Sequence, residues 1–328
     1  GVDMKYSILK FLKDSDGFVS GEDISSSLGV SRTAVWKHIN ELKQEGYVIE
    51  SSSRKGYKLI ESPDRLTKQE LMPFLNTRYV GRHIVYFDSI GSTNDEARKI
   101  ASKGSKEGLV VIAEEQTSGR GRMGRKWTTP KYQAIAFSVV IMPKIKPEES
   151  PGITLVMGTA VCRAIREVCS LDAGIKWPND IIINNKKVCG ILTELSAEID
   201  AVNYIIIGVG INANVERFPE EIKEIATSIY LESGRKVSRK ELISKVFLEF
   251  ENLYEDYKIN GLKNIIDEFK SYSVTLNKRV NVTSINESFK GQAADILSDG
   301  TLVIKLDDGS ERKVLSGDVS VRGIGGYV

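Results

Sequence analysis

The stretch Gly119-Arg120-Gly121-Arg122-Met123-Gly124-Arg125-Lys126-Trp127 is the most unusual part of this chain of 328 residues. It satisfies the GxGxxG pattern of dinucleotide-binding loops, but a loop of that kind must lead directly into a helix. Here Thr128-Thr129-Pro130 follows, and residues 134–142 then read as a strand. We therefore exclude a dinucleotide-binding fold of this type. No phosphate-binding loop of the form GxxxxGKS or GxxxxGKT occurs in the sequence either.

Positive charge is concentrated around this stretch. Residues 117–131 contain five basic side chains and no acidic one. Glycine lets backbone N–H groups approach a ligand closely, so a loop of this composition can fold around a polyanion. The alternative is a basic surface loop that contacts nucleic acid or nothing.

The residues on either side of the loop predict a mixed α/β domain over 66–272. Several expected strands follow one another through short turns such as Asn184-Asn185. This spacing indicates a mixed or mostly antiparallel sheet with helices on it, and not a regular βαβ repeat. The expected strands are 83–88, 109–113, 135–142, 174–176, 180–183, 187–195 and 203–211, and the expected helices are 94–102, 153–170 and 239–258.

The C-terminal residues 275–328 predict a small SH3-like β-barrel. Apolar and polar residues alternate there in short runs, and the turn signals Ser298-Asp299-Gly300 and Asp307-Asp308-Gly309 separate some of them. The expected strands are 280–283, 291–297, 302–306 and 312–315.

The N-terminal residues 4–62 predict a winged helix-turn-helix that binds DNA. Helical periodicity over 4–12, 21–28 and 31–45 precedes two strand-like runs at 47–50 and 56–60. The third helix would enter the major groove and the loop between the strands would contact phosphate. Winged helices also serve as protein-interaction modules, which is the alternative here. The expected DNA-binding residues are Ser31, Arg32, Thr33, Trp36, Lys37, Arg54 and Lys55.

Composition limits the remaining possibilities. Lys and Arg number 46 and Asp and Glu 44, so the net charge of +2 excludes a uniformly basic nucleic-acid binder. No apolar run approaches the roughly 20 residues of a membrane helix, and no signal peptide opens the chain.

The three cysteines form no CxxC pair, which indicates buried thiols in a cytoplasmic protein. We expect Gly1, Val2 and Asp3 to be a cloning remnant ahead of a native start at Met4.

Three further clusters have the composition of a polar ligand site. Gly91-Ser92-Thr93-Asn94 lies between an expected strand and an expected helix, where it suits a polar head group or simply caps the helix. Lys176-Trp177-Pro178-Asn179-Asp180 joins two expected strands, and Lys187 opens the next. Gly208-Val209-Gly210-Ile211-Asn212 ends a strand with glycines that admit close approach of a ligand.

Taken in order, these motifs resemble those of the bacterial biotin–protein ligases, in particular the bifunctional ligases that also repress the biotin operon. GRGRxGRxW with KWPND is highly specific, whereas GSTN or GVGIN alone is weak. The expected winged helix and barrel complete a three-domain plan, so the resemblance covers essentially the whole chain. The motifs are GSTN at 91–94, GRGRMGRKW at 119–127, KWPND at 176–180, KKVCGIL at 186–192 and GVGIN at 208–212.

The resemblance implies an ATP-dependent ligation in two steps. The biotin carboxylate attacks the α-phosphate of ATP to give biotinyl-5'-AMP and pyrophosphate, and a lysine of a biotin carboxyl carrier protein then displaces AMP. Mg²⁺ would neutralise the leaving pyrophosphate. No cluster of metal ligands is readable in the sequence, so we assign no metal-binding residue.

The resemblance also assigns residues position by position. Lys187, Arg120 and Arg122 would be catalytic. In residues 214–228, which in the family order over the adenylate, we assign no individual residue, although Phe218 and Ile225 could supply apolar contacts. Cys189 stands where a small residue such as Ala is common. The biotin site would comprise Ser92, Thr93, Asn94, Gln116, Arg120, Gly121, Arg122 and Lys187. The ATP and adenylate site would comprise Arg120, Arg122, Arg125, Trp127, Lys176, Asn179, Asp180, Lys187 and Asn212.

In the family the adenylate is also a corepressor, which implies a homodimer on the operator DNA of the biotin synthesis genes when the adenylate is bound. Two other functions stay open at this point. One is a biotin-sensing transcription factor that no longer catalyses, although every Arg–Gly, KWPND and Lys187 position is retained. The other is a lipoate ligase, which shares the catalytic fold but lacks GRGRxGRxW and normally has no winged helix.

Overall fold

The computed structural model describes residues 3–316 and 319–328, which fall into two compact units, Gly1–Arg65 and Leu66–Val328. The expected cloning remnant includes Gly1 and Val2, which lie outside the described residues. Asp3 caps the first helix, because its carboxylate accepts a hydrogen bond from the Lys5 N–H at 3.0 Å.

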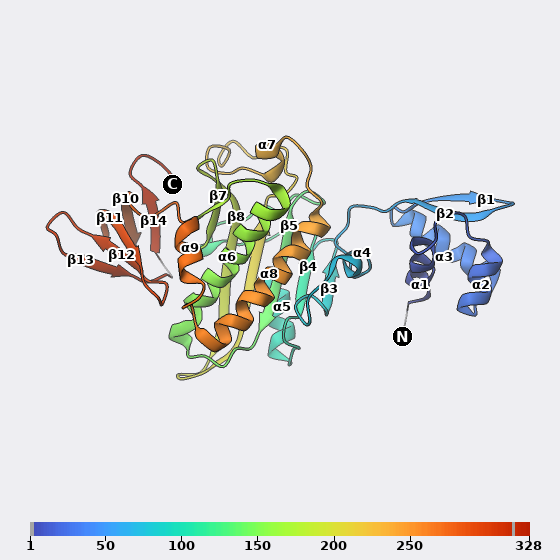
Figure 1. Ribbon diagram of the computed structural model, residues 1–328, viewed down its shortest axis with the longest axis horizontal. Helices are drawn as coiled ribbons and strands as arrows, with labels where there is room; N and C mark the ends of the chain where they lie inside the picture. The colour runs from blue at the N-terminus through green and yellow to red at the C-terminus, as the bar shows by residue number, and fades with distance from the viewer. Residues whose placement is uncertain (1–2, 317–318) are drawn as a thin grey trace. The chain divides into compact units, whose positions relative to one another are not determined.

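The first unit is a three-helix bundle followed by a β-hairpin, as the sequence predicts (Figure 1). The hydroxyl of Ser31 accepts the N–H of Ala34 at 3.1 Å and begins the third helix, and Gly29 ends the second in the left-handed region at φ 67°. Apolar residues of all three helices and of the hairpin form its core. Its elements are α1 (Met4–Lys13), α2 (Gly21–Leu28), α3 (Arg32–Gln44), β1 (Val48–Ser52) and β2 (Gly56–Glu61).

A seven-stranded mixed sheet is the centre of the second unit. Its strand order is β3-β4-β5-β9-β8-β7-β6, and among the described strands β3 and β4 pair in parallel while the other neighbours pair antiparallel. The prediction of a mixed, mostly antiparallel sheet is confirmed. The strands are β3 (Ile84–Phe87), β4 (Val110–Ala113), β5 (Ile135–Ile141), β6 (Gly174–Lys176), β7 (Asp180–Ile183), β8 (Lys186–Ala197) and β9 (Val202–Ile211).

Helices cover both faces of this sheet (Figure 1). Strand residues alternate between faces: Val110 and Ile112 pack in the large core, and Val111 packs with Ala97 of α5 (Thr93–Ser102) in a smaller one. The long helices α6 (Ser150–Cys169) and α8 (Arg239–Asn260) pack together over the large core. The sequence did not predict α4 (Lys68–Leu71), α7 (Ile229–Ser233), α9 (Ile266–Tyr272) or the 3-10 turns η1 (Met72–Phe74), η2 (Arg122–Gly124) and η3 (Pro147–Glu149).

The C-terminal strands form a five-stranded antiparallel sheet in the order β13-β12-β11-β10-β14. The fifth strand was not expected from the sequence, and the closure of this sheet into an SH3-like barrel stays a prediction. The side chain of Trp177 connects this sheet to the part of the unit that holds the seven-stranded sheet, because its Nε1 donates to the Gly300 carbonyl at 3.0 Å. The strands are β10 (Arg279–Ser284), β11 (Ser288–Ile296), β12 (Leu302–Lys305), β13 (Glu311–Val314) and β14 (Val319–Gly323).

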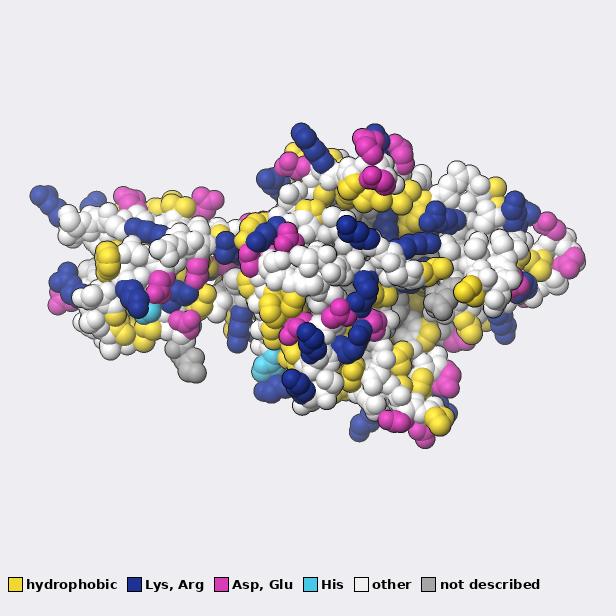
Figure 2. All heavy atoms as spheres, turned by 180° about the vertical axis from the view of Figure 1, so that it is seen from behind, with side chains coloured by type: hydrophobic (Ala, Val, Ile, Leu, Met, Phe, Trp, Pro, Cys, Tyr) yellow, Lys and Arg dark blue, Asp and Glu magenta, His cyan; other side chains and the backbone are white. Residues whose placement is uncertain are grey.

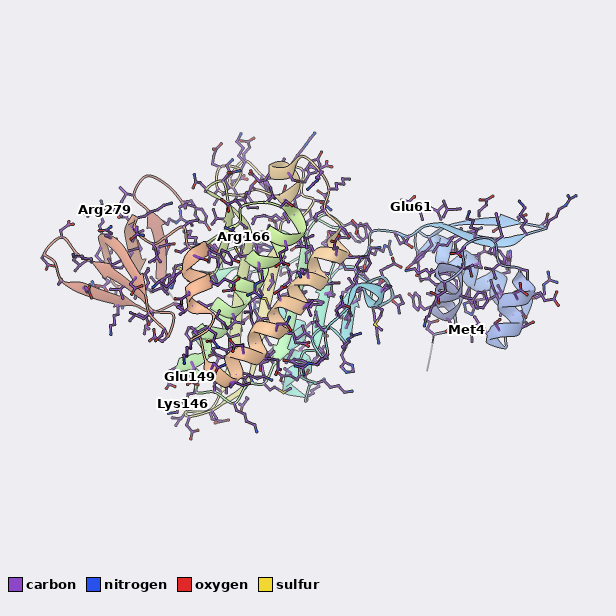
Figure 3. All side chains as sticks on the ribbon, in the orientation of Figure 1. Met4, Glu61, Lys146, Glu149, Arg166 and Arg279 are labelled. Atoms are coloured by element: carbon purple, nitrogen blue, oxygen red, sulfur yellow. The ribbon has the colours of Figure 1, made fainter. Side chains whose placement is uncertain are left out.

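Helix α9 joins the two parts of the second unit. The guanidinium of Arg166 on α6, labelled in Figure 3, lies 4.5 Å from the ring centroid of Tyr272 at the end of α9. Lys270 of α9 pairs with Asp295 of β11 at 2.7 Å. These contacts connect α6, α9 and the C-terminal sheet.

A fully buried ion pair holds the beginning of the second unit. Arg239 Nη1 lies 2.8 Å from Glu114 Oε2, and neither side chain is exposed. The other oxygen of Glu114 accepts the N–H of Leu66 at 2.8 Å and the hydroxyl of Tyr86 at 3.1 Å. A buried charge of this kind is tolerated only when it is paired and hydrogen-bonded.

Surface charge agrees with the near-zero net charge. Basic and acidic side chains are interspersed over the face that Figure 2 shows, with no coat of one sign.

The three cysteines are free and buried, as expected, and burial raises the pKa of Cys162 to about 12 and of Cys169 to about 11. In the described part of the chain, we find no helix with the length and apolarity that crossing a membrane requires.

Candidate active site

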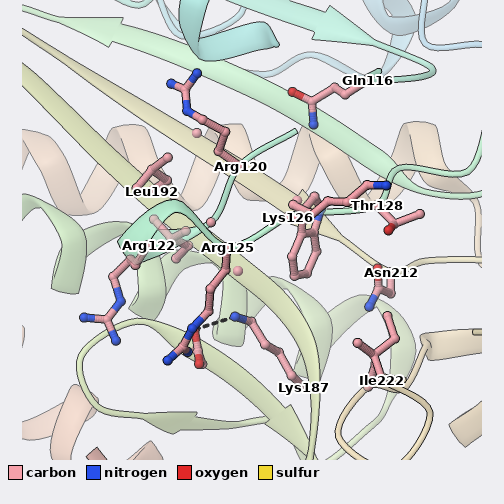
Figure 4. Close-up of a pocket in the computed structure, with 18 of the residues that line it drawn as sticks. Gln116, Arg120, Arg122, Arg125, Lys126, Thr128, Lys187, Leu192, Asn212 and Ile222 are labelled. Carbon is pink, nitrogen blue, oxygen red and sulfur yellow. Dashed lines mark ion pairs between the residues drawn. The ribbon is translucent and has the colours of Figure 1, made fainter. Parts of the chain in front are cut away.

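A cavity of about 690 Å³ in the second unit collects most of the residues that the sequence singled out. Its walls come from the turn before α5, the 119–127 loop, strands β8 and β9, and the segment after β9. Figure 4 shows side chains of the loop together with Lys187, Asn212 and Ile222. The predicted residues that line it are Ser92, Thr93, Asn94, Gln116, Arg120, Gly121, Arg122, Arg125, Trp127, Asp180, Lys187, Asn212, Phe218 and Ile225.

One end of the cavity is a hydrogen-bonded cluster of small polar side chains. The N–H of Thr93 donates to Gln116 Oε1 at 3.0 Å, and Asn94 Nδ2 donates to Glu194 Oε1 at 2.9 Å. The buried hydroxyl of Ser138 lies 2.7 Å from Thr93 Oγ1 and 2.5 Å from Asn94 Oδ1. These bonds fix the donors and acceptors of the cluster before a ligand arrives. The sequence did not indicate Ser138, because it looks like any residue of a buried strand.

Glycines form the floor beside this cluster. A Cβ atom on Gly208 would stand 2.3 Å from Asn94 Oδ1, and one on Gly210 would stand 2.2 Å from the indole nitrogen of Trp127. Both lie on β9, and neither needs a left-handed backbone. Glycine is required at these positions because Asn94 and Trp127 lie directly on the strand.

The arginines of the 119–127 loop point in different directions. Arg120 Nη1 donates to both Asp95 oxygens at 2.8 and 3.0 Å, and its Nη2 donates to Glu194 at 2.9 Å. The hydrogen bonds to Asp95 raise the pKa of Arg120. Arg122 donates to the carbonyl of Val319 on β14 at 3.0 Å. Figure 4 shows the guanidinium of Arg120 turned away from those of Arg122 and Arg125.

The opposite end of the cavity contains a buried carboxylate surrounded by cationic groups. Lys187 Nζ lies 3.0 Å from Asp180 Oδ1, the ion pair that Figure 4 marks, and 5.3 Å from the ring centroid of Trp127. Burial alone would raise the pKa of Asp180, but the charges of Lys187 and Lys176 and a hydrogen bond from Tyr327 outweigh it and lower that pKa. Burial lowers the pKa of Lys176 to about 8, although Asp180 opposes the shift.

Two predicted residues do not line the cavity. Lys176 is buried behind Asp180, with its Nζ 3.9 Å from Asp180 Oδ2. Asn179 is also buried, and its Nδ2 donates to the Ile191 carbonyl at 2.6 Å. By position both support the turn and not the ligand surface. Asn212, at the end of β9, lines the cavity and donates through Nδ2 to the Thr227 carbonyl at 3.1 Å.

Other lining residues were missed by sequence reasoning. Arg322 of β14 and Tyr327 of the C-terminal segment reach the cavity from the C-terminal sheet, and Ile222 lies between Phe218 and Ile225 in the segment after β9. No local sequence pattern around residues 322–327 indicates a ligand site. The fold of the C-terminal sheet, and not a motif, brings this segment close to Asp180.

The predicted DNA-binding residues all lie on the first unit. Ser31, Arg32, Thr33, Trp36 and Lys37 are exposed on the N-terminal half of α3, and Trp36 is 60% exposed. Arg54 and Lys55 are exposed in the turn of the β1–β2 hairpin, and Lys55 Nζ lies 5.5 Å from the ring of Phe18.

A cluster of small polar side chains, a glycine floor and a cation-rich end lie in one cavity, an arrangement that fits a ligase that brings an organic acid to a nucleotide phosphate. Family models agree with this class. The biotin/lipoate A/B protein ligase family matches residues 86–212, a helix-turn-helix domain matches 5–58, and the biotin protein ligase C-terminal domain matches 275–322.

Proteins that are similar to this chain over nearly its whole length identify the family. The chain is 40% identical to the bifunctional ligase/repressor BirA of Bacillus subtilis over 95% of this chain and 96% of that protein. It is 28% identical to the BirA of Escherichia coli over 93% of each chain. The chain belongs to the family of bifunctional biotin–protein ligase/repressors, as the sequence motifs indicated.

A solved structure supports the same assignment. The biotin protein ligase of Aquifex aeolicus in complex with biotin and ATP superimposes with a TM-score of 0.65 at 29% identity, covering 74% of this chain and 99% of that one. The full-length ligase/repressor relatives and this biotin ligase favour the biotin ligase over the lipoate ligase.

Proposed function

We propose that the cavity activates biotin as biotinyl-5'-AMP and that the chain transfers the biotinyl group to a lysine of a biotin carboxyl carrier protein. One observation carries this proposal: the polar cluster around Thr93 and Asn94 and the cationic end around Lys187 share a single cavity of about 690 Å³. Such a cavity takes a neutral ureido head at one end and a carboxylate beside a phosphate at the other.

The charges explain why the reaction needs this site. A carboxylate and the ATP phosphates repel each other, and the attack on the α-phosphate accumulates negative charge. The Lys187 ammonium and the Arg122 and Arg125 guanidiniums line the cavity where this charge would develop. We assign biotin binding to Ser92, Thr93, Asn94 and Gln116 and nucleotide binding to Arg122, Arg125, Trp127 and Asn212.

Arg120 has a different place in this scheme. Its guanidinium holds the loop to Asp95 on α5 and Glu194 on β8. We propose that Arg120 reaches the biotin carboxylate only when the ligand replaces one of these carboxylates. ATP would be bound as its Mg²⁺ complex, in which the metal, held by the phosphates, would supply positive charge to the leaving pyrophosphate. In the described part of the chain no group of three or more His, Cys, Asp or Glu side chains is arranged to hold a metal ion.

A transfer assay tests the ligase function. Radiolabelled biotin, Mg-ATP and the apo form of a biotin carboxyl carrier domain are incubated with the full chain. We expect labelled carrier only when ATP is present. Binding of biotin without label on the carrier would leave a biotin-sensing transcription factor as the function.

Substitution of Gly210 tests the assignment of the floor. Gly210→Ala places a Cβ 2.2 Å from the Trp127 indole nitrogen, so the ring must move. Overpacking of this kind costs about 1–3 kcal/mol, and we expect biotin to bind about tenfold more weakly by calorimetry. Gly158→Ala on α6 is the matched control, because its Cβ would meet only Ile191 at 4.0 Å. Equal biotin affinity in the Gly210→Ala variant and the control would contradict the assignment.

We also propose that the first unit binds the operator of the biotin synthesis genes and that the adenylate promotes a homodimer that occupies it. The exposed Arg32, Lys37, Arg54 and Lys55 supply the groups for phosphate and base contacts. The three cysteines are free, buried thiols. Free thiols are typical of proteins in a reducing compartment, which supports a cytoplasmic location.

Operator binding is expected to depend on the ligand. A ligand changes an equilibrium only through its different affinities for the two states, and such couplings typically amount to about 5- to 150-fold. We expect biotin and Mg-ATP to increase the affinity of the full chain for a DNA fragment from upstream of the biotin synthesis genes. The increase should lie within this range of about 5- to 150-fold. Filter binding or fluorescence anisotropy measures it. The same affinity with and without the ligands would contradict regulation by the adenylate.

A further inference from the structure

The C-terminal segment after β14 turns back into the cavity and places an aromatic hydroxyl on the buried carboxylate. The hydroxyl of Tyr327 donates to Asp180 Oδ2, while Asp180 Oδ1 lies 3.0 Å from Lys187 Nζ. The two oxygens of this carboxylate therefore have different partners, and Tyr327 lies 147 residues from Asp180 in sequence. Tyr327 is also among the residues that line the cavity.

The geometry around the ring is specific. Lys176 Nζ lies 4.0 Å from the centroid of the Tyr327 ring, and the Arg322 guanidinium lies 5.6 Å from it. Cations over an aromatic face are attracted to it, so the ring is held in place independently of its hydroxyl. Burial is the main cause that raises the pKa of Tyr327, and the negative charge of Asp180 raises it further. The phenol therefore stays protonated and donates its hydrogen bond at neutral pH.

The turn that returns the segment depends on Gly323. A Cβ on Gly323 would stand 2.1 Å from the carbonyl oxygen of Val328. Any side chain at this position must push the segment away from the strand end, and Tyr327 would move with it.

We propose that Tyr327 is a positioning residue for the ligation, because its hydroxyl fixes the rotation of Asp180 so that Oδ1 faces Lys187 and the lysine ammonium stays aimed into the cavity. The inference rests on the proposed role of Lys187. A lysine has a long, flexible side chain, and the Lys187 side chain is 26% exposed, so its direction depends on a fixed carboxylate. Tyr327 touches Asp180 and acts on the reacting atoms only through it.

Removal of the hydroxyl should alter both rate and pH dependence. Hydrogen bonds to the ionised form lower the pKa of a carboxyl group, so loss of this bond raises the pKa of Asp180. The pH at which Asp180 is protonated and Lys187 loses its partner then rises. The charged and titratable groups that face Asp180 and Tyr327 are Lys176 on β6, Lys187 and Cys189 on β8, Arg322 on β14 and Arg122 of the loop.

The test compares Tyr327→Phe with the unaltered full chain in a pyrophosphate-release assay across a range of pH. Tyr327→Phe keeps the ring beneath Lys176 and removes only the hydroxyl. We expect kcat to fall about tenfold, KM for biotin to stay constant, and the acid limb of the kcat profile to move upward by about one pH unit. Gly323→Ala should lower kcat as well, since it displaces the same segment.

Tyr272→Phe is the matched control, because its hydroxyl also donates to a carboxylate, that of Glu268 at 2.8 Å, away from the cavity. Unchanged kcat and an unchanged acid limb in Tyr327→Phe would overturn the proposal. A lower melting temperature as the sole change would also overturn it, since that is the effect of a structural role. Absence of pyrophosphate release from the unaltered chain would instead contradict the proposed function.

Discussion

Lys187→Ala is expected to slow the formation of biotinyl-5'-AMP by about 100- to 1,000-fold while the protein stays folded. A donor aimed at the place where charge develops in the transition state commonly contributes an effect of this size. Lys187 lines the cavity with its ammonium 3.0 Å from Asp180. After the substitution, Asp180 still has Tyr327 and Lys176 as partners, so the fold should tolerate the change. Pyrophosphate release measures the rate and thermal unfolding measures the fold.

The neighbouring residue provides the control for this prediction. Lys186 precedes Lys187 on β8, but its Nζ lies 3.3 Å from the Lys223 carbonyl and it does not line the cavity. Lys186→Ala also removes one positive charge and should leave the rate of adenylate formation unchanged. If Lys187→Ala and Lys186→Ala form the adenylate at the same rate, Lys187 has no part in the chemistry.

Arg239→Met is expected to lower the free energy of unfolding of residues 66–328 by about 3–5 kcal/mol. Removing one partner of a buried pair leaves an uncompensated charge, and this costs far more than the pair itself contributes. Glu114 and Arg239 are both 0% exposed, and Arg239 Nη1 also donates to the Ala134 carbonyl at 2.9 Å. Urea unfolding of the full chain, with the transition of the second unit analysed separately, measures the loss.

Two further variants separate the buried charge from other effects. Lys258→Met lies on the same helix, but its partner Glu255 is 33% exposed, so the loss should be at most about 1 kcal/mol. Glu114→Leu combined with Arg239→Met removes both charges and should recover much of the stability. A loss below about 1 kcal/mol in Arg239→Met alone would show that the buried carboxylate is compensated in another way.

Much of the fold could be predicted because its signals are local. The hydrophobic periods of 135–142 and 153–170 correspond to β5 and α6, and Ser31 and Gly29 have the capping roles expected of them. The unexpected elements, such as α9 and β14, are short. Their apolar residues follow no sustained pattern, and packing against the rest of the unit stabilises them.

The site residues that belong to sequence motifs could be predicted. The hydrogen-bond and ion-pair partners that the tertiary fold brings to them could not. GSTN, the arginine–glycine loop, Asp180 and Lys187 meet in the cavity as expected. The partners of Arg120 lie 25 and 74 residues away, and a net charge of +2 says nothing about which acid neutralises which base. Tyr327 reaches Asp180 from 147 residues away, because contacts such as the hydrogen bond from Trp177 to Gly300 hold the C-terminal sheet in place.

Mass spectrometry of the full chain after incubation with biotin and Mg-ATP detects the intermediate that the cavity should form. Native conditions keep a bound intermediate on the protein. We expect a retained mass equal to that of biotinyl-5'-AMP, present with ATP and absent with biotin alone. A chain that retains only biotin in both samples would contradict the claim that this cavity joins a carboxylate to a nucleotide phosphate.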